Sequence, residues 1–279
     1  MKHIVLKDGT IKEFSKKMDF MGIINVTDNS FYSGSRTYNT DDAIKRAEKL
    51  IEEGATFLDI GGESTRPGSD PVDVEDEINR VCPVIKEIKR LYPEILLSVD
   101  TYRAKTALAA IENGVDIIND ISGLTFDENM VKVIAETKVP LILMHIKGKP
   151  KTMHVKPHYD NVVKEVYEFL EKQINYAYEN GVEKNKIIID LGIGFGKNAE
   201  HNIELLKNIS YFDSLNLPHL LAVSRKKFIG RTLNHEDAAD RLFGTIGISV
   251  YARTKGIEIA RVHDVKENLE AVRMVEEFI

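Results

Sequence analysis

Three residues of the chain have types that suit the recognition of a polar ring. Asp100, Asn119 and Asp190 each follow a short apolar run, and together they offer two carboxylates and one amide. If they converge on one pocket, they can read the donor and acceptor edge of a fused aminoheterocycle. Such a site rejects ligands that lack the matching groups, because its buried polar atoms would then stay unpaired.

A second set of residues can carry positive charge, and it comprises Arg66, Lys226, Arg261 and His263. Side chains of this kind suit an anion, most simply a phosphate or a diphosphate. An ordinary salt bridge at the edge of the core is the alternative for Arg261. That alternative is weaker here because Arg261 interrupts the otherwise apolar run over 258–262.

The stretch over 57–68 is the most informative loop. An apolar run, 57–60, leads into Gly61-Gly62-Glu63-Ser64-Thr65-Arg66-Pro67-Gly68, where two glycines free the backbone and a proline prevents a regular ladder. Apolar strands that end in polar loops hold ligand contacts in many α/β enzymes. We expect Arg66 to contact an anion and Glu63 to have a structural role, with a solvated turn as the alternative.

Eight short apolar runs indicate how these residues are positioned. The runs cover 20–24, 56–60, 95–99, 116–118, 140–144, 186–189, 219–223 and 258–262. Continuous apolar runs are typical of parallel strands that are buried on both faces. Helices are expected over 41–53, 73–92, 101–113, 161–180, 198–208, 236–255 and 265–278. The alternation predicts an α/β fold, a (β/α)8 TIM barrel, in preference to an open doubly wound sheet.

The polar residues that follow the strands should share one rim of this barrel. Some of them have a simpler interpretation as caps: Asp100 and Thr101 for the helix over 101–113, Asp120 for a turn, and Ser224 for the seventh helix. A short N-terminal β-hairpin is expected around Asp8-Gly9, between the apolar runs 3–6 and 10–14. We expect residues 1–279 to form a single domain.

A glycine-rich segment, 190–197, follows the sixth strand. Its spacing is G-x-G-x-G, which fits neither the dinucleotide fingerprint nor the Walker loop. We expect a tight loop that brings Phe195 over the pocket, with a simple glycine-rich turn as the alternative. His145, which closes the fifth strand, is expected to be a structural histidine. A Mg²⁺ ion held mainly by substrate phosphates would need only one oxygen ligand, such as Asn25.

The composition excludes several classes of protein. A net charge of -6 argues against a dedicated nucleic-acid binder. The single cysteine, Cys82, excludes an internal disulfide framework and fits a reducing compartment. No stretch approaches the ~18 apolar residues of a membrane span, and no apolar run follows Met1-Lys2-His3 as in a secretory signal. We therefore expect a cytoplasmic protein without a membrane or nucleic-acid partner.

Segments along nearly the full length resemble dihydropteroate synthases, and they are 22–27, 59–68, 98–101, 118–120, 192–197, 224–226 and 261–265. That family is a TIM barrel and a sulfonamide target in folate biosynthesis. It condenses 6-hydroxymethyl-7,8-dihydropterin diphosphate with 4-aminobenzoate, giving 7,8-dihydropteroate and diphosphate. The resemblance implies an SN1-like transferase reaction in which diphosphate leaves before the amine attacks. It also implies a homodimer.

The resemblance assigns a role to each matched position. It implies that the pterin is bound by Asp100, Asn119, Asp190 and Lys226. It implies that the diphosphate is bound by Arg66, Arg261 and His263. The 4-aminobenzoate would be bordered by Thr65, Pro67, Phe195, Ser224 and Lys226. Mg²⁺ would be bound by Asn25, and the catalytic residues would be Lys226, Arg261 and Asp100.

Some positions depart from the family pattern. In the first loop, where the family has a proline, two acidic residues and a glycine, this chain has Asp28, Asn29, Ser33 and Ser35. Leu191 replaces the proline that usually follows the aspartate of the sixth strand. The altered first loop keeps open a non-catalytic pterin-binding paralogue. A pterin-dependent corrinoid methyltransferase is a weaker alternative, because it should lack the Arg-Pro-Gly, Ser-Arg-Lys and Arg-Val-His segments that are present here.

Overall fold

A closed barrel of parallel strands forms the centre of the computed structural model, which describes residues 2–15, 17–26, 40–64, 71–153, 155 and 157–279. Its strands are β3 (Asp19–Asn25), β4 (Phe57–Gly61), β5 (Leu96–Asp100), β6 (Ile117–Asp120), β7 (Leu141–Met144), β8 (Ile187–Asp190), β9 (His219–Leu221) and β10 (Ile259–Val262). β10 pairs with both β9 and β3, which closes the ring. The predicted TIM barrel is confirmed.

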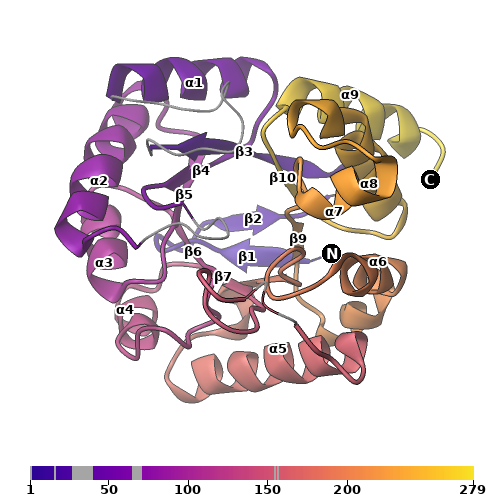
Figure 1. The fold of residues 1–279 in the computed structure, drawn as a ribbon. Coiled ribbons are helices and arrows are strands. Elements are labelled where there is room, and N and C mark those ends of the chain that lie inside the picture. The colour runs from indigo at the N-terminus through magenta and orange to yellow at the C-terminus, as the bar shows by residue number, and fades with distance from the viewer. Residues whose placement is uncertain (1, 16, 27–39, 65–70, 154, 156) are drawn as a thin grey trace.

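Helices surround the barrel, as Figure 1 shows in a view along its axis. They are α1 (Thr40–Glu52), α2 (Val74–Leu91), α3 (Ala104–Glu112), α4 (Met130–Thr137), α5 (Val162–Glu179), α6 (Ala199–Lys207), α7 (Lys227–Leu233), α8 (Leu242–Thr254) and α9 (Val265–Glu276). Short 3-10 helices are η2 (Lys184–Lys186), η3 (Ile209–Leu215) and η4 (Ala239–Arg241). In α1, Ala43, Ala47 and Leu50 recur at helical spacing and are buried, so one face packs on the strands.

The structure differs from the helix predictions in two places. α4 was not predicted, and the helical region expected over 236–255 begins as η4 and becomes α8 only at Leu242, after the separate helix α7. The expected cap of α3 by Asp100 or Thr101 is wrong, because Asp127 Oδ2 accepts from the Ala104 N–H at 2.8 Å. Ser224 does not cap α7, whose N-cap residue is Lys226. The prediction for Asp120 is confirmed, since its carboxylate accepts from the Ser122 and Leu124 N–H groups.

Apolar side chains inside the barrel form a core separate from the layer between strands and helices. Ile4 and Phe14, from the hairpin of β1 (His3–Val5) and β2 (Ile11–Glu13), pack against this inner core. The hairpin is drawn pale behind the barrel in Figure 1, so it closes the amino-terminal end. Lys186 Nζ fixes it by donating to the carbonyls of Val5, at 3.0 Å, and Leu6, at 3.3 Å.

Strand register brings the polar residues to the opposite end. Gly61 pairs with Asp100, and Asp100 pairs with Asn119, so neighbouring strands present inward positions at the same height. Asp190, at the end of β8, pairs with Met144 of β7. Because side chains alternate between the two faces of a strand, these residues point into the carboxyl-terminal mouth of the barrel. No helix in the described part of the chain is long and apolar enough to cross a membrane; the cytoplasmic location stays a prediction.

Candidate functional site

The carboxyl ends of the strands enclose a cavity of about 220 Å³. Its lining contains the predicted site residues Asn25, Asp100, Asn119, Asp190, Phe195, Ser224, Lys226, Arg261 and His263. The structure therefore brings together residues from the first strand of the barrel to the last. Thr65, Arg66 and Pro67, and the substituted positions between Asp28 and Ser35, lie outside the described residues.

Arg261 joins two carboxylates at the floor of this cavity. Its Nε lies 2.5 Å from Asp59 Oδ2, and its Nη2 lies 3.0 Å from Asp100 Oδ2. Asn119 Nδ2 also donates to Asp59 Oδ2, at 3.1 Å. Burial raises the pKa of Asp100 to about 7, with the Arg261 charge acting in the opposite direction. Arg261 does form salt bridges, as the alternative interpretation expected, but these salt bridges lie within the site.

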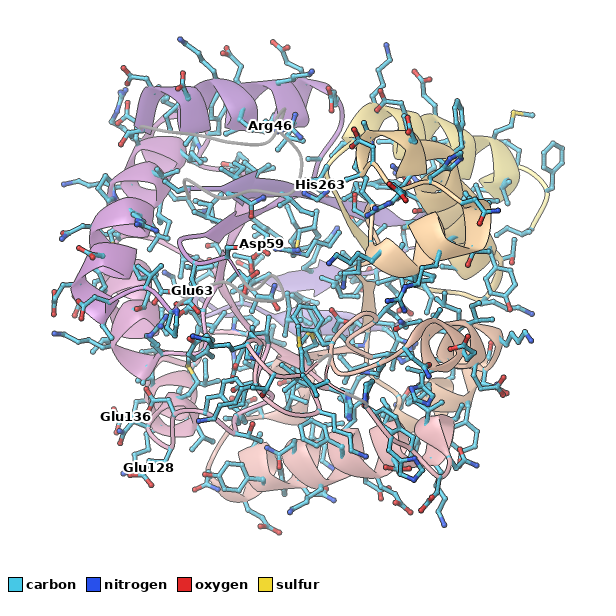
Figure 2. All side chains as sticks on the ribbon, viewed as in Figure 1. Arg46, Asp59, Glu63, Glu128, Glu136 and His263 are labelled. Carbon is cyan, nitrogen blue, oxygen red and sulfur yellow. The ribbon has the colours of Figure 1, made fainter. Side chains whose placement is uncertain are left out.

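Asp59 does not line the cavity but binds two residues that do, Arg261 and Asn119, and it was not predicted from the sequence. Its side chain is fully buried within β4, and it lies inside the ring of helices in Figure 2, whereas Glu128 and Glu136 lie at the periphery. Its Oδ1 has no hydrogen-bond partner among the described residues. A carboxylate inside a continuous apolar run is itself a signal, because a buried charge is retained only with a partner or a function.

Lys226 and Asp190 form the opposite wall. Lys226 donates to the carbonyl of Ile193, and its Nζ lies 4.7 Å from the centre of the Phe195 ring. Burial lowers the pKa of Lys226 to about 8, and the charge of Asp190 opposes this shift. Burial raises the pKa of Asp190, which is opposed by Lys226 and by the Gly192 N–H, a donor at 2.8 Å. The pair combines a cation with a carboxylate in a water-poor site.

Phe195 extends an apolar surface beside these charges. It packs against a cluster formed by Ile121, Met144, Ile146 and Met153. As predicted, the segment over 190–197 is a tight loop that carries Phe195 to the cavity. A flat aromatic ligand could bind along this surface while its polar edge meets the carboxylates.

His263 and Ser224 are linked at the rim. The His263 N–H donates to Ser224 Oγ at 3.1 Å, and the ring Nδ1 lies 2.8 Å from the same oxygen. Burial, together with the Arg261 charge, lowers the pKa of His263 to about 3. The imidazole is therefore neutral at pH 7, although the sequence allowed it to carry positive charge. A neutral imidazole can still hydrogen-bond to an anion.

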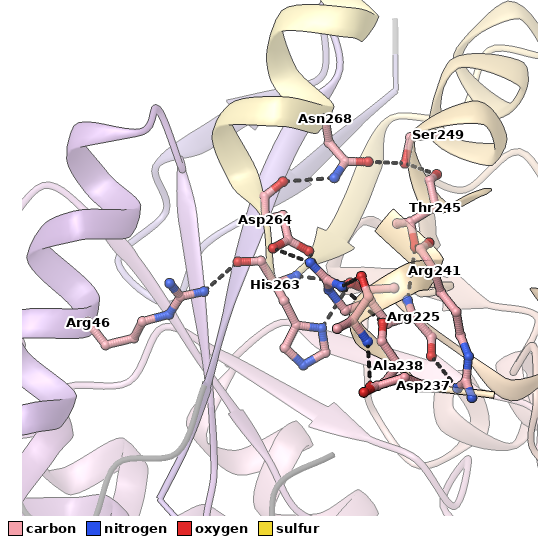
Figure 3. A network of polar contacts seen from close by, with 12 residues as sticks. Arg46, Arg225, Asp237, Ala238, Arg241, Thr245, Ser249, His263, Asp264 and Asn268 are labelled. Atoms are coloured by element: carbon pink, nitrogen blue, oxygen red, sulfur yellow. Dashed lines mark hydrogen bonds and ion pairs between the residues drawn. The ribbon is translucent and has the colours of Figure 1, made fainter. Parts of the chain in front are cut away.

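Arg225, in the middle of the Ser-Arg-Lys segment, also lines the cavity, but its guanidinium is bound by Asp264. It has a φ of 54° and binds Asp264 through Nε at 2.8 Å and Nη2 at 2.9 Å. Figure 3 shows it within a polar network that also contains Thr245, Ser249 and Asn268, while Arg46 donates to the carbonyl of His263. The network fixes the backbone between Ser224 and Lys226.

Glu63 holds the start of the neighbouring loop. Its carboxylate accepts from Tyr102 OH at 2.7 Å, from Arg103 Nη2 at 2.6 Å and from the Val72 N–H at 2.9 Å. Arg103 also binds the buried Glu77, at 2.9 Å. The geometry agrees with the structural role expected for Glu63.

A divalent cation would have few protein ligands here. The described residues contain no group of three or more His, Cys, Asp or Glu that could hold a metal ion. However, a Cβ added to Gly61 would lie 3.8 Å from Asn25 Oδ1 and 4.0 Å from Asp100 Oδ2. The missing side chain leaves space between an amide oxygen and a carboxylate. This donor set suits Mg²⁺ that takes most of its ligands from substrate and water.

Comparisons with known proteins agree with this site. Residues 21–263 match the pterin binding enzyme family. The dihydropteroate synthase of Escherichia coli K12 is 44% identical over 256 residues, which cover 92% of this chain and 90% of that protein. The Yersinia pestis dihydropteroate synthase, solved with a sulfonamide drug, superimposes with a TM-score of 0.93 at 37% identity and covers 99% of this chain and 98% of its own.

A third relative was solved with small molecules of the reaction. The Xanthomonas albilineans dihydropteroate synthase with 4-aminobenzoic acid has a TM-score of 0.90 at 36% identity, covering 99% of this chain and 97% of its own. The same enzyme was also solved in complex with 7,8-dihydropteroate. Family, relatives and cavity thus agree. The chain belongs to the dihydropteroate synthase family of pterin binding enzymes, which are transferases of folate synthesis.

Proposed function

We propose that the chain condenses 6-hydroxymethyl-7,8-dihydropterin diphosphate with 4-aminobenzoate. The bond between the pterin methylene carbon and the diphosphate oxygen breaks, a bond from that carbon to the amine nitrogen forms, and the amine loses one proton. The products are 7,8-dihydropteroate and diphosphate. One observation carries the proposal: Asp100, Asn119 and Asp190 line the same cavity as Lys226 and Arg261.

The pterin is proposed to bind between the acidic residues and Lys226. Asp100, Asn119 and Asp190 offer acceptors and an amide to its ring edge. When the diphosphate departs, positive charge develops on the pterin. The carboxylates stabilise that charge because they are fixed in a buried site, where electrostatic interactions are strong. This arrangement supports an SN1-like order of bond breaking and bond making.

Arg261 is proposed to bind the departing diphosphate together with His263 and Arg66. Its contacts with Asp59 and Asp100 use Nε and Nη2, and the Nη1 donors have no hydrogen-bond partner among the described residues. His263 provides a neutral ring at the same rim. The role of Arg66 rests on the family resemblance.

Asn25 is proposed to bind Mg²⁺ at the space left by Gly61. When bound, the ion would neutralise charge on the diphosphate oxygens. The protein side of the reaction is performed by the fixed cations and carboxylates described above.

The 4-aminobenzoate is proposed to lie against Phe195 and Ser224, with Lys226 between it and the pterin. Thr65 and Pro67 are proposed to complete this subsite by resemblance. The position next to Lys226 directs the amine toward the methylene carbon after the diphosphate has left.

A homodimer is also proposed. The buried face of α8 is polar, with Thr245 and Ser249, whereas Phe243 is 82% exposed and shares an outer face with Tyr251. Residues four apart lie on one side of a helix, so Phe243, Gly247 and Tyr251 lie on the same side, and exposed apolar side chains favour association. A second copy of this chain is the proposed occupant of this face.

The homodimer is tested by analytical sedimentation. The wild type should have twice the mass of one chain, and Phe243→Glu should reduce the measured mass toward that of a single chain. A monomeric wild type would contradict the proposal.

The function is tested by mixing the protein with Mg²⁺, the pterin diphosphate and 4-aminobenzoate, and then measuring dihydropteroate. Product formation that requires all three supports the proposal. Tight pterin binding without product would overturn it and favour the non-catalytic paralogue. Methyl transfer to a corrinoid without dihydropteroate would favour the methyltransferase.

A further inference from the structure

Lys197 is a buried lysine to which neither the mechanism nor the family resemblance gives a role. It is 4% exposed, and its Nζ lies 2.8 Å from His145 Nδ1, 2.8 Å from the Gly192 carbonyl and 3.0 Å from the Phe195 carbonyl. An ammonium group has three N–H donors, and the three acceptors match them one for one. Burial lowers the pKa of Lys197, and the charge of Asp190 opposes the shift.

The loop around Lys197 fits closely against the segment that follows β7. Gly192 has a φ of +64°, and a Cβ there would lie 1.8 Å from the His145 carbonyl oxygen. A Cβ on Gly196 would lie 2.3 Å from the Lys147 carbonyl oxygen, and Tyr159 OH donates to the Gly196 carbonyl at 2.9 Å. The backbone can follow this path only while its carbonyls are satisfied, and Lys197 satisfies two of them.

The same loop holds the site lysine. Lys226 donates to the carbonyl of Ile193 and lies over the ring of Phe195. The Gly194 N–H between them donates to Asn202 Oδ1 at 2.7 Å. A displacement of the loop would therefore move both the aromatic wall and the acceptor that orients Lys226.

We propose that Lys197 is a positioning residue: held by His145, it fixes the 191–197 loop and so places Phe195 and the Ile193 carbonyl against Lys226. The catalytic consequence rests on the proposed function, but the structural consequence does not. A methionine at this position would fill a similar volume and leave three acceptors without a donor. Lost hydrogen bonds to a charged group correspond to about 10- to 100-fold in an equilibrium constant.

The chain contains no tryptophan, so Phe195→Trp creates a single fluorescent reporter on this loop. We would compare acrylamide quenching of the introduced indole with and without Lys197→Met. Lys186→Met is the matched control, because Lys186 is also 4% exposed and also donates to two backbone carbonyls, at the opposite end of the barrel. Both variants should lose stability. Only Lys197→Met should increase the quenching of the indole.

Steady-state kinetics with Phe195 intact provide the second measurement. Lys197→Met should raise KM for 4-aminobenzoate by about 10-fold and should also raise KM for the pterin diphosphate, because Lys226 contacts both proposed subsites. In the Phe195→Ala background the further effect of Lys197→Met on KM for 4-aminobenzoate should be smaller, because part of it acts through the Phe195 wall. Unchanged quenching, with equal effects of Lys197→Met and Lys186→Met, would overturn the proposal.

The proposal can still be tested if Lys197→Met does not fold or if the protein has no synthase activity. If Lys197→Met does not fold, His145→Phe removes one acceptor partner of Lys197 while keeping a ring in place, and it should show the same changes with smaller size. If the protein makes no dihydropteroate at all, the proposed function fails, while quenching of the Phe195→Trp reporter still measures the positioning role.

Discussion

Arg261 Nε lies 2.5 Å from Asp59 Oδ2, and this contact connects β10 with β4 directly below the cavity. Asp59 also accepts from Asn119, so one buried carboxylate orients two residues of the proposed site. A buried charge held by an arginine fork has a fixed direction, because the planar donors allow little rotation. The relationship makes Asp59 a positioning residue for the proposed reaction.

Asp59→Asn should lower kcat/KM by about 10²-fold, in line with the loss of one preorganised charged contact. The charge of Asp59 contributes to the raised pKa of Asp100. Its removal also leaves Arg261 more fully paired with Asp100, so both effects lower that pKa. The acidic limb of the kcat/KM profile should therefore move to lower pH. A rate loss without any shift of this limb would contradict the coupling.

Lys226 should determine the alkaline limit of activity. Burial lowers its pKa to about 8, while Asp190 and Asp100 oppose the shift and Arg261 reinforces it. The lysine is cationic below that value and loses its charge above it, so kcat/KM should fall above about pH 8. Lys226→Met should reduce kcat/KM by at least about 10²-fold and remove this limb. An alkaline limb that survives the substitution would assign it to another group. Lys186→Met serves as the control.

Features of the fold that depend on residues close together in the sequence could be predicted, whereas features that lack a local signal could not. The strand expected over 20–24 is β3, Asp19–Asn25, because a continuous apolar run has few other solutions. α4 was missed because it is short and its C-cap, Lys138, adopts φ 56° without a glycine to mark it. Arg225 adopts a left-handed backbone, with φ 54°, although it is not a glycine, and no local pattern predicts this.

Within the site, too, some residues could be predicted from the sequence and others could not. Residues at strand ends could be proposed because parallel strands share one rim. Asp59 was missed because it lies two residues before the end of β4, and its partner Arg261 is 202 positions away. Lys197 was visible only as part of a glycine-rich segment, since its role depends on where the His145 ring and two carbonyls come together.

His219 should contribute to acid sensitivity at a place remote from the mouth of the barrel. Burial lowers its pKa to about 3, and the unfolded chain should bind the proton near pH 6.5. The unfolded state thus binds more protons between these values. The free energy of unfolding should fall with decreasing pH in this window, by up to about 1.4 kcal/mol per pH unit from this group.

His219→Phe should weaken that dependence. Urea denaturation at pH 7, 6 and 5 would give the slope for the wild type, for His219→Phe and for a replacement of the exposed His235 by glutamine. The phenylalanine variant should become more stable relative to the wild type as the pH decreases. Parallel slopes for all three proteins would show that His219 does not titrate between the folded and unfolded states.

Gly192→Ala should be among the most damaging small substitutions in the chain. The residue has a φ of +64°, and its added Cβ would lie 1.8 Å from the His145 carbonyl oxygen, so the backbone must move either at Gly192 or at His145.

Gly256→Ala is the matched control, because Gly256 has a φ of +85° and no atom within 4 Å of the added Cβ. The control should cost about 1–2 kcal/mol from backbone strain alone. Gly192→Ala should cost more than about 4 kcal/mol or displace the loop that carries Phe195, and denaturant midpoints at constant m-value measure the difference. Equal midpoints for the two variants would mean that the loop at Gly192 yields without cost, which would also weaken the positioning role of Lys197.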